Sequence, residues 1–318
     1  HMYIGEVVTM RKIVVIAGPT AVGKTSFAIR VSELFNGEIV SCDSMQLYRF
    51  MDIGSAKPAP DEQQRARHHL IDMIDPRDEF SVAQYQKLAK DAINDILSRG
   101  KLPVISGGTG LYLNSLLYDM DFSPLSGDRE YRQKLEKEAE VKGGAYLHEM
   151  LKIQDPDAAE QIHPNNTKKI IRALERLKDG EGRIRRFTDV TNETKDYEPL
   201  LIGLTRDRAL LYDRINRRVD QLVHQGLVDE VRMLMDMGLT KDDISMKGIG
   251  YKEIMEYLEG SIPFEEAVDN VKKNTRHYAK KQLTWFRRYD KMKWYDISEN
   301  ADEERALQDI ERWLAKKI

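Results

Sequence analysis

The chain has 318 residues, of which 41% are hydrophobic and 32% charged, and its formal net charge is −3. This length is typical of one large domain or two moderate ones, and the apolar runs are shorter than the roughly 20 residues of a membrane span. The single cysteine, Cys42, excludes an internal disulfide and a cysteine-based metal knuckle, and the charge excludes a wholly basic nucleic-acid binder. We expect a cytoplasmic enzyme with no secretory signal and no membrane partner.

The first third of the chain alternates between strand-like and helical patterns. The strand-like runs are Ile13–Ala17, Glu38–Ser41 and Leu102–Ser106, and the helical runs are Lys24–Phe35 and Ser81–Arg99. Ser81 is a suitable N-cap, and Gly100 a suitable helix end. Such alternation predicts an α/β fold, with a parallel sheet flanked by helices on both faces.

The run GPTAVGKT, from Gly18 to Thr25, matches the pattern G-x-x-x-x-G-K-[ST] between a predicted strand and a predicted helix. Glycine lets the backbone curl so that several N–H groups point at one anion, and the helix N-terminus adds its dipole. Lys24 adds a full positive charge, and the Thr25 hydroxyl can hold Mg²⁺. We predict a site for a di- or triphosphate with Mg²⁺, although the loop does not identify the phosphate compound.

Asp43 directly follows the second predicted strand. The carboxyl ends of parallel strands line the ligand crevice, so Asp43 should face the phosphate loop. It could hold Mg²⁺ through water or act as a general base towards an acceptor group. The alternative is an aspartate that only caps the next turn.

The next core strand ends in Ser106-Gly107-Gly108-Thr109 rather than in an aspartate. Phosphate-loop ATPases usually place a metal-binding aspartate here, so this ending argues against a motor or switch ATPase. The glycines allow close backbone approach, and Thr109 offers a hydroxyl near the crevice. A purely structural turn would also explain the two glycines.

Residues 119–197 carry dense charge, no convincing strand and two helical patches, Glu130–Val141 and Asn166–Leu177. Asn165 or Asn166 can cap the second patch, and Gly180 can end it. We interpret this segment as an all-helical insertion between core parts at 10–118 and 198–318. Its second helical patch holds a small basic group, Lys168, Lys169 and Arg172.

The core is predicted to resume with a buried strand, Leu200–Leu204, followed by one long helix from Asp207 towards Met237. Helical segments near Tyr251–Leu258 and Glu265–Arg288, a strand at Lys293–Ile297 and a terminal helix from Asp302 complete the pattern.

Arg214 and Arg218 are four residues apart on this long helix, so both project from one face and can bind phosphate oxygens. Arg217 lies on another face and is expected in solvent. Surface arginines are also common on charged helices, so the spacing alone leaves both interpretations open.

From Lys272 to Trp294 the sequence holds nine Lys and Arg residues and one Asp, interleaved with aromatic residues. Cations neutralise RNA phosphates and aromatic rings stack on bases. An amphipathic helix with a solvated basic face and a buried Trp285 and Phe286 explains the composition equally well, and one helix can do both.

Taken together, the motifs resemble those of the bacterial tRNA dimethylallyltransferase family. They run in order from about residue 11 to the C-terminus: GPTAVGKT, DSMQLYR, ISGGTGLY, HPNN, LYDRINRRVDQL, KGIGYKE and TRHYAKKQLTWFR. The family has a phosphate-loop core with a helical insertion. Its members transfer a dimethylallyl group to N6 of adenosine 37, beside the tRNA anticodon. Val22 stands where relatives often carry Ser.

The resemblance implies roles for particular residues. The diphosphate of dimethylallyl diphosphate would be bound by Gly18, Thr20, Ala21, Val22, Gly23, Lys24, Thr25, Arg214 and Arg218, with Mg²⁺ at Thr25. Catalytic roles would fall to Asp43 as general base, Lys24, Thr109 and Arg218. The tRNA would contact Asp43, Ser44, Met45, Gln46, Thr109, Arg132, Lys168, Lys169, Arg172, Lys280, Lys281 and Arg287.

We therefore predict an enzyme that prenylates the tRNA anticodon stem-loop as a monomer. Three alternatives stay open: an isopentenyltransferase acting on free AMP, ADP or ATP, a small-molecule kinase on the same core, and a non-enzymatic RNA-binding protein with a relic nucleotide site. The first two leave the basic helix without a partner, and the third leaves Lys24, Thr25 and Asp43 without a purpose.

Overall fold

A six-stranded sheet forms the centre of the larger part of the molecule. The computed structural model describes residues 11–120, 129–178 and 192–318. The strands lie in the order β3-β2-β4-β1-β5-β6, and each pair of neighbours is parallel. Their bounds are β1 (Lys12–Ala17), β2 (Gly37–Ser41), β3 (His68–His69), β4 (Leu102–Gly107), β5 (Glu198–Thr205) and β6 (Lys293–Asp296). The predicted α/β fold with a parallel sheet is confirmed.

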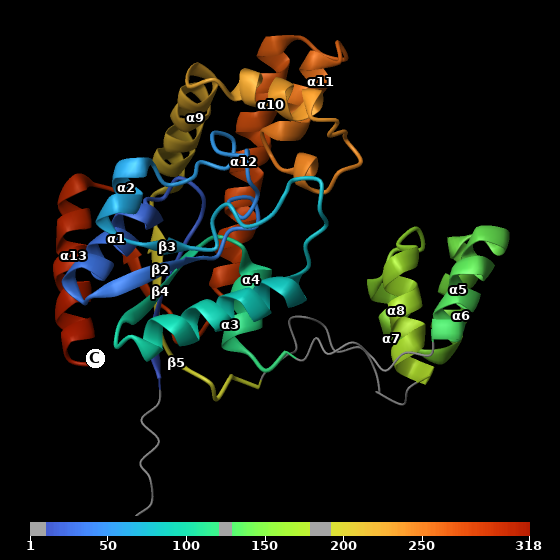
Figure 1. The fold of residues 1–318 in the computed structure, drawn as a ribbon, viewed down its shortest axis with the longest axis horizontal. Coiled ribbons are helices and arrows are strands. Elements are labelled where there is room, and N and C mark those ends of the chain that lie inside the picture. The colour runs from blue at the N-terminus through green and yellow to red at the C-terminus, as the bar shows by residue number, and fades with distance from the viewer. Residues whose placement is uncertain (1–10, 121–128, 179–191) are drawn as a thin grey trace, which may run out of the picture. The chain divides into compact units, whose positions relative to one another are not determined.

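The sheet is buried on both faces. Val14 and Ile16 of β1 pack in one core with residues of α1 and α13, including Phe27 and Ile310. Ile13, like Val15, is fully buried as well, and alternation along the strand directs it to the opposite face. Figure 1 shows α1 and α13 together on one side of the sheet and α3 with α4 on the other.

Several helices of this part, including α1 and α3, have bounds within one residue of those predicted. They are α1 (Lys24–Leu34), α2 (Pro60–Arg65), α3 (Val82–Ser98), α4 (Gly110–Leu117), α9 (Arg208–His224), α10 (Leu227–Asp236), α11 (Tyr251–Leu258), α12 (Phe264–Phe286) and α13 (Asn300–Ala315), with a 3₁₀ turn η2 (Ser245–Lys247). The Ser81 side chain accepts from the backbone N–H of Gln84, as expected of an N-cap.

The prediction of one long helix from Asp207 towards Met237 was wrong. Asp207 does cap α9, but the helix ends at His224 and α10 begins at Leu227. Gly226 lies between them with φ of 112°, a left-handed conformation that glycine adopts without steric cost. The break lets α10 and α11 build a second apolar core around Leu234 and Ile254.

The terminal helix begins two residues earlier than predicted. It starts at Asn300, because Asp302 sits inside its first turn and accepts from the backbone N–H of Glu299 in a capping box.

Residues 118–193 form a separate compact unit whose described part is helical. It contains α5 (Arg129–Lys142), α6 (Gly144–Gln154), α7 (Pro156–Gln161) and α8 (Thr167–Lys178). Leu135, Leu147 and Leu174 are fully buried in its own core. The Asn166 side chain accepts from the N–H of Lys169 just before α8, which is the predicted cap. The predicted Gly180 stop lies outside the described residues.

Candidate active site

The phosphate loop joins β1 to α1. Ala21 and Gly23 both take left-handed conformations, with φ of 63° and 115°, which curl the backbone around the start of the helix. Gly18 packs so closely on β5 that an added Cβ would lie 2.8 Å from the Leu204 carbonyl oxygen. No side chain caps α1, so its first N–H groups are available to an anion.

Two loop amides are already committed within the protein. The N–H of Thr20 donates to Gln282 Oε1 at 2.9 Å, and the N–H of Val22 donates to the Pro19 carbonyl oxygen at 3.3 Å. Lys24 Nζ donates to the carbonyl oxygens of Gly18 and Pro19, which holds the ammonium inside the loop. Lys24 and the first amides of α1 are therefore the loop groups best placed to bind an anion, whereas the N–H groups of Thr20 and Val22 already have partners.

The electrostatics of the loop depend on its burial. Burial lowers the pKa of Lys24 to about 8; the Asp43 carboxylate opposes this shift and Arg218 reinforces it. Burial also lowers the pKa of Arg218, again opposed by Asp43. A negatively charged ligand would relieve the repulsion between the two cations, so the site is arranged for an anion.

The arginines of α9 divide only in part as their spacing predicts. Arg214 Nε donates to the Ala21 carbonyl oxygen at 3.0 Å and so braces the phosphate loop. Arg218 lines the cavity next to the loop, as do Arg214 and Arg217. Arg217 also pairs with Asp213 in an exposed i,i+4 ion pair, so it is exposed as expected but does not lie away from the site.

Asp43 follows β2 and caps the turn after it. Its Oδ1 accepts from the backbone N–H groups of Met45 and Gln46, at 2.8 and 3.3 Å. Within the described residues no hydrogen bond reaches Oδ2, and Asp43 lines the cavity that also contains Lys24. The turn-capping interpretation is therefore correct for one oxygen, while the other is left to face a ligand.

The glycines after β4 serve close packing. A Cβ on Gly107 would lie 2.2 Å from the Cys42 carbonyl oxygen, and one on Gly108 would lie 2.1 Å from Gln282 Nε2. Thr109 Oγ1 accepts from the N–H of Ser44 at 3.1 Å, so it fixes the turn that carries Asp43. Thr109 is not among the described residues that line either cavity.

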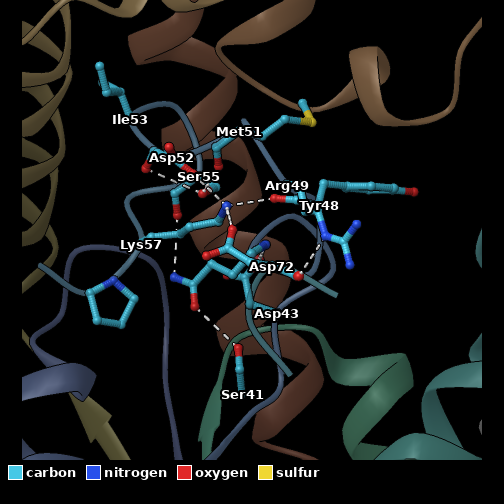
Figure 2. Close-up of polar contacts among 12 residues, drawn as sticks. Ser41, Asp43, Tyr48, Arg49, Met51, Asp52, Ile53, Ser55, Lys57 and Asp72 are labelled. Carbon is cyan, nitrogen blue, oxygen red and sulfur yellow. Dashed lines mark hydrogen bonds and ion pairs between the residues drawn. The ribbon is translucent and has the colours of Figure 1, made fainter. Parts of the chain in front are cut away.

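The β2–α2 loop, residues 42–59, is tied down from inside (Figure 2). Gln46 accepts from Ser41 Oγ at 3.2 Å and donates to the carbonyl oxygens of Ser55 and Ala56. Lys57, whose side chain is almost fully buried, donates to the Tyr48 carbonyl oxygen and pairs with two aspartates, Asp52 and Asp72. These contacts fold the loop into one wall of the site.

Glu230 of α10 holds the same loop from outside. Its buried carboxylate accepts from the backbone N–H groups of Asp52, Ile53 and Gly54, at 2.8 to 3.1 Å, and from the Tyr251 hydroxyl at 2.8 Å. A carboxylate with four donors is fully satisfied in a buried place.

Two adjoining cavities meet at this wall. The larger, of about 980 Å³, holds the phosphate loop, Asp43, Gln46 and Arg218. The smaller, of about 340 Å³, is mainly apolar and lies against α9, α12 and the start of α11. Its apolar lining includes Met45, Ile215, Val219, Leu222, Leu227, Ile249 and Val271. Thr20, Asp43, Arg218 and Tyr278 line both cavities.

Helix α12 both closes the site and carries cations. Phe286 is buried, and the Trp285 ring lies so close to Gly110 that an added Cβ there would be 2.4 Å from it. The predicted cations Lys280, Lys281 and Arg287 are exposed, and none forms an ion pair with the described residues. The amphipathic interpretation is confirmed for Phe286, which is buried, whereas Trp285 is half-buried and Tyr278 is exposed. RNA binding by the outward-facing cations stays a prediction.

The helical unit carries a second set of exposed cations. Lys168, Lys169 and Arg172 lie on α8, exposed and without an ion pair in the described part of the chain. Arg132 differs, because its guanidinium makes a bidentate pair with the buried Glu175, at 2.7 and 2.9 Å. Arg132 thus braces α5 against α8.

Comparison with known proteins identifies the family. The family model for IPP transferase matches residues 46–289. The chain belongs to the IPP transferase family. A tRNA dimethylallyltransferase from Alkaliphilus oremlandii is 52% identical over 288 residues, covering 91% of this chain and 92% of that protein. One from Caldanaerobacter subterraneus is 49% identical over 310 residues, covering 96% of this chain and 98% of the relative.

Solved structures of the family share this fold. The full-length tRNA isopentenylpyrophosphate transferase from Bacillus halodurans is 44% identical, with a TM-score of 0.73 and 96% of both chains covered. A eukaryotic dimethylallyltransferase acting on tRNA is 26% identical with a TM-score of 0.82, covering 96% of this chain and 80% of the other. In the described part of this family member, no helix is long and apolar enough to cross a membrane.

Several residues that shape the site of this IPP transferase were not predicted from the sequence. Gln282 and Tyr278 of α12 line the cavities, and the i,i+4 spacing of these two residues was a signal that could have been used. Glu230 gave no local signal. Neither did Arg206, whose guanidinium donates to the carbonyl oxygens of Val22 and Ile297 and pairs with Glu303.

A magnesium ion fits the donors present only together with a bound diphosphate. The described residues contain no group of three or more His, Cys, Asp or Glu side chains that could hold a metal. Thr25 and Asp43 line the same cavity, however. Mg²⁺ commonly binds through one or two protein oxygens together with substrate phosphates and water, which is the donor set that this cavity can complete.

Proposed function

We propose that this protein transfers the dimethylallyl group of dimethylallyl diphosphate to N6 of adenosine 37 in tRNA and releases diphosphate. One observation carries the proposal: the cavity that holds the phosphate loop, Asp43 and Arg218 joins a smaller apolar cavity at the same residues. An allylic diphosphate has just these two parts, a charged head and a short apolar tail. Membership of the IPP transferase family supports the same reaction.

The diphosphate would lie against the first turn of α1. Lys24, Arg218 and the helix amides are its ligands, and Arg214 supports the loop through Ala21. Preorganised donors of this kind act on the charge that develops on a leaving group, and each is typically worth roughly 3–4 kcal/mol. Mg²⁺, held at Thr25, would further neutralise the charge on the diphosphate.

Asp43 is the proposed base. In the reaction the C1–O bond breaks with its electron pair leaving on diphosphate, N6 forms a bond to C1, and the N6 proton passes to Asp43. The backbone N–H groups of Met45 and Gln46 orient the carboxylate through Oδ1, so Oδ2 is the oxygen that accepts the proton. General-base help of this kind typically gives about 10²–10⁴-fold.

The adenine must leave the anticodon loop to reach Asp43. Ser44 and Met45 line the smaller cavity and Gln46 the larger, so the segment after Asp43 is in place to contact the base, with Thr109 supporting it. The exposed cations of α12 and α8 are the proposed phosphate contacts, and residues 119–197 the proposed tRNA-contacting insertion. We expect the enzyme to act as a monomer.

One set of assays separates this proposal from its alternatives. Purified protein and labelled dimethylallyl diphosphate are mixed with undermodified tRNA, with AMP or ATP, or with ATP and a small alcohol. We expect label only in tRNA, at adenosine 37. Label in free nucleotide would identify an adenylate isopentenyltransferase, and phosphorylated alcohol would identify a kinase.

A further inference from the structure

One aromatic side chain stands where the two cavities meet. Of the described residues that line them, Tyr278 is the only one with an aromatic ring, and it lines both. Its exposed fraction is 36%, so a ligand at the junction can touch the ring. The other described residues that line both cavities are Thr20, Asp43, Arg218 and four aliphatic or small side chains, Ala21, Ser55, Ala56 and Leu222.

The position of Tyr278 along α12 relates it to the phosphate loop. Val271, Thr275 and Tyr278 line the smaller cavity, and Tyr278 and Gln282 line the larger, so one stripe of the helix follows the path between them. Gln282 accepts from the N–H of Thr20. Tyr278 is therefore about 6 Å along the helix axis from the residue that anchors the loop, which is where the carbon next to a bound diphosphate would pass into the apolar cavity.

The residues assigned so far do not stabilise the positive charge that develops on the allylic carbons. Lys24 and Arg218 stabilise a departing diphosphate, but they repel positive charge on the carbons that it leaves behind. Asp43 is the only carboxylate lining both cavities within the described residues, and the proposed mechanism uses it for the N6 proton. An aromatic face supplies negative potential without a charged nucleophile that would capture the carbocation.

We propose that the face of the Tyr278 ring stabilises the positive charge that develops on the allylic carbons as the C1–O bond breaks. This inference rests on the proposed function. Tyr278 forms no bond in the step: the electron pair leaves with diphosphate, the N6 lone pair forms the new bond to C1, and the proton goes to Asp43. Burial, with Asp43 adding to it, raises the pKa of Tyr278 to about 12, so the phenol stays neutral and is a poor competitor for the allyl group.

The test compares the ring with the hydroxyl. Single-turnover transfer to tRNA is measured for Tyr278→Phe and Tyr278→Leu, together with binding of an unreactive thiolodiphosphate analogue of the substrate. We expect Tyr278→Phe to lose no more than about threefold, and Tyr278→Leu to lose roughly 10- to 30-fold in rate with unchanged analogue binding. Tyr257→Leu, on α11 and outside both cavities, is the matched control and should change neither quantity.

A fluorinated substrate distinguishes stabilisation of positive charge from a merely structural role of Tyr278, because a structural role would not change how much fluorine slows transfer. Replacing one methyl hydrogen of the dimethylallyl group by fluorine disfavours positive charge and slows transfer. We expect Tyr278→Leu to enlarge that penalty and Tyr257→Leu to leave it as in the parent. If Tyr278→Leu does not fold, a series of progressively fluorinated phenylalanines at position 278 keeps the shape while weakening the ring potential, and the rate should fall along it.

The possible outcomes are distinct. Equal losses in the Phe and Leu variants would assign the effect to the hydroxyl and overturn the inference. A loss explained by weaker analogue binding, or a fluorine penalty that no variant changes, would overturn it too. If the parent protein transfers no dimethylallyl group to tRNA, the proposed function itself fails, which the parent assay reveals before any variant is compared.

Discussion

Gln282 on α12 connects the phosphate loop to the end of β4, because its side chain accepts from the N–H of Thr20 at 2.9 Å and donates to the Gly108 carbonyl oxygen at 3.0 Å. The side chain is buried, so removing it would leave two buried polar groups without partners. Such groups typically cost about 1–3 kcal/mol each.

We predict that Gln282→Met weakens binding of dimethylallyl diphosphate by roughly 10-fold or more while tRNA affinity changes little. Gln282→Glu should be worse, because it keeps the acceptor for Thr20 but adds negative charge beside the diphosphate. Isothermal titration with an unreactive analogue of dimethylallyl diphosphate measures the affinity of each variant. Parent-like affinity in the two variants would contradict a role for this bridge.

The depressed pKa of Lys24 predicts a proton uptake on ligand binding. Its pKa is about 8 in the free protein, against an ordinary value of 10.5, so the side chain loses charge as the pH rises through 8. A bound diphosphate favours the charged form and raises the pKa. Affinity should therefore fall above pH 8, and binding at pH 9 should take up a proton, whereas binding at pH 7 should not.

Calorimetry in buffers of different ionisation enthalpy measures this uptake directly. Lys24→Arg is the comparison, because a guanidinium stays charged at both pH values. If the uptake at pH 9 persists in a folded Lys24→Arg protein, another group is responsible.

Asp43 should matter for turnover far more than for tRNA affinity. Asp43→Asn keeps the acceptor oxygen for Met45 and Gln46 but removes the base, so we expect a loss of about 10²–10⁴-fold in the single-turnover rate. Filter binding of tRNA should change little. Comparable losses in both measurements would make Asp43 a binding residue instead.

The exposed cations of α12 should set part of the salt dependence of tRNA binding. Neutralising Lys280 and Lys281 to Gln removes two of the proposed phosphate contacts, which should flatten the slope of log affinity against log salt by about 1.4 for a single-stranded loop. The pair Lys241→Gln and Lys316→Gln, both exposed, is the control. An unchanged slope in the Lys280 and Lys281 variant would remove this face from the interface.

Glu38 is expected to stabilise the fold in a pH-dependent way. Burial alone would raise its pKa, but hydrogen bonds from Arg99 and His69 outweigh this and lower it to about 2. The stabilisation is present above the unfolded value near 4.5 and is lost as the pH falls towards 2. By linkage it is on the order of 3 kcal/mol.

Urea unfolding of Glu38→Gln and the parent between pH 7 and pH 3 tests this. The stability difference should be largest at neutral pH and shrink on acidification. Glu33→Gln, which removes an exposed pair with Arg65, should give a small difference at every pH. A gap between Glu38→Gln and the parent that stays constant across this range would contradict the linkage.

Local patterns predicted the part of the site that is local in sequence. The phosphate loop, Asp43 and the pair Arg214 and Arg218 each lie on elements whose periodicity or turn residues are visible in the chain, so their places followed from the rule for parallel strands. The contacts that shape the loop are different. Gln282 reaches Thr20 across 262 positions, and Glu230 reaches Ile53 across 177, and no periodicity encodes such pairs.

The same limit explains the missed elements. Strand β3 is two residues long, and α2 spans six, too short for a period to appear. The predicted helix from Asp207 missed the break because Gly226 also fits within a helix at modest cost. The break becomes apparent only from the tertiary structure, in which α10 and α11 pack in an apolar core of their own.

The hydrogen bonds and the ion pair of Arg206 have a consequence for folding during synthesis. The phosphate loop is translated first, yet Val22 is held through Arg206 to Ile297 and Glu303, near the end of the chain. A growing polypeptide lacks Ile297 and Glu303 until β6 and the start of α13 have been made. The hydrogen bonds that hold Val22 in place through Arg206 are therefore completed only after most of the sheet and its helices exist.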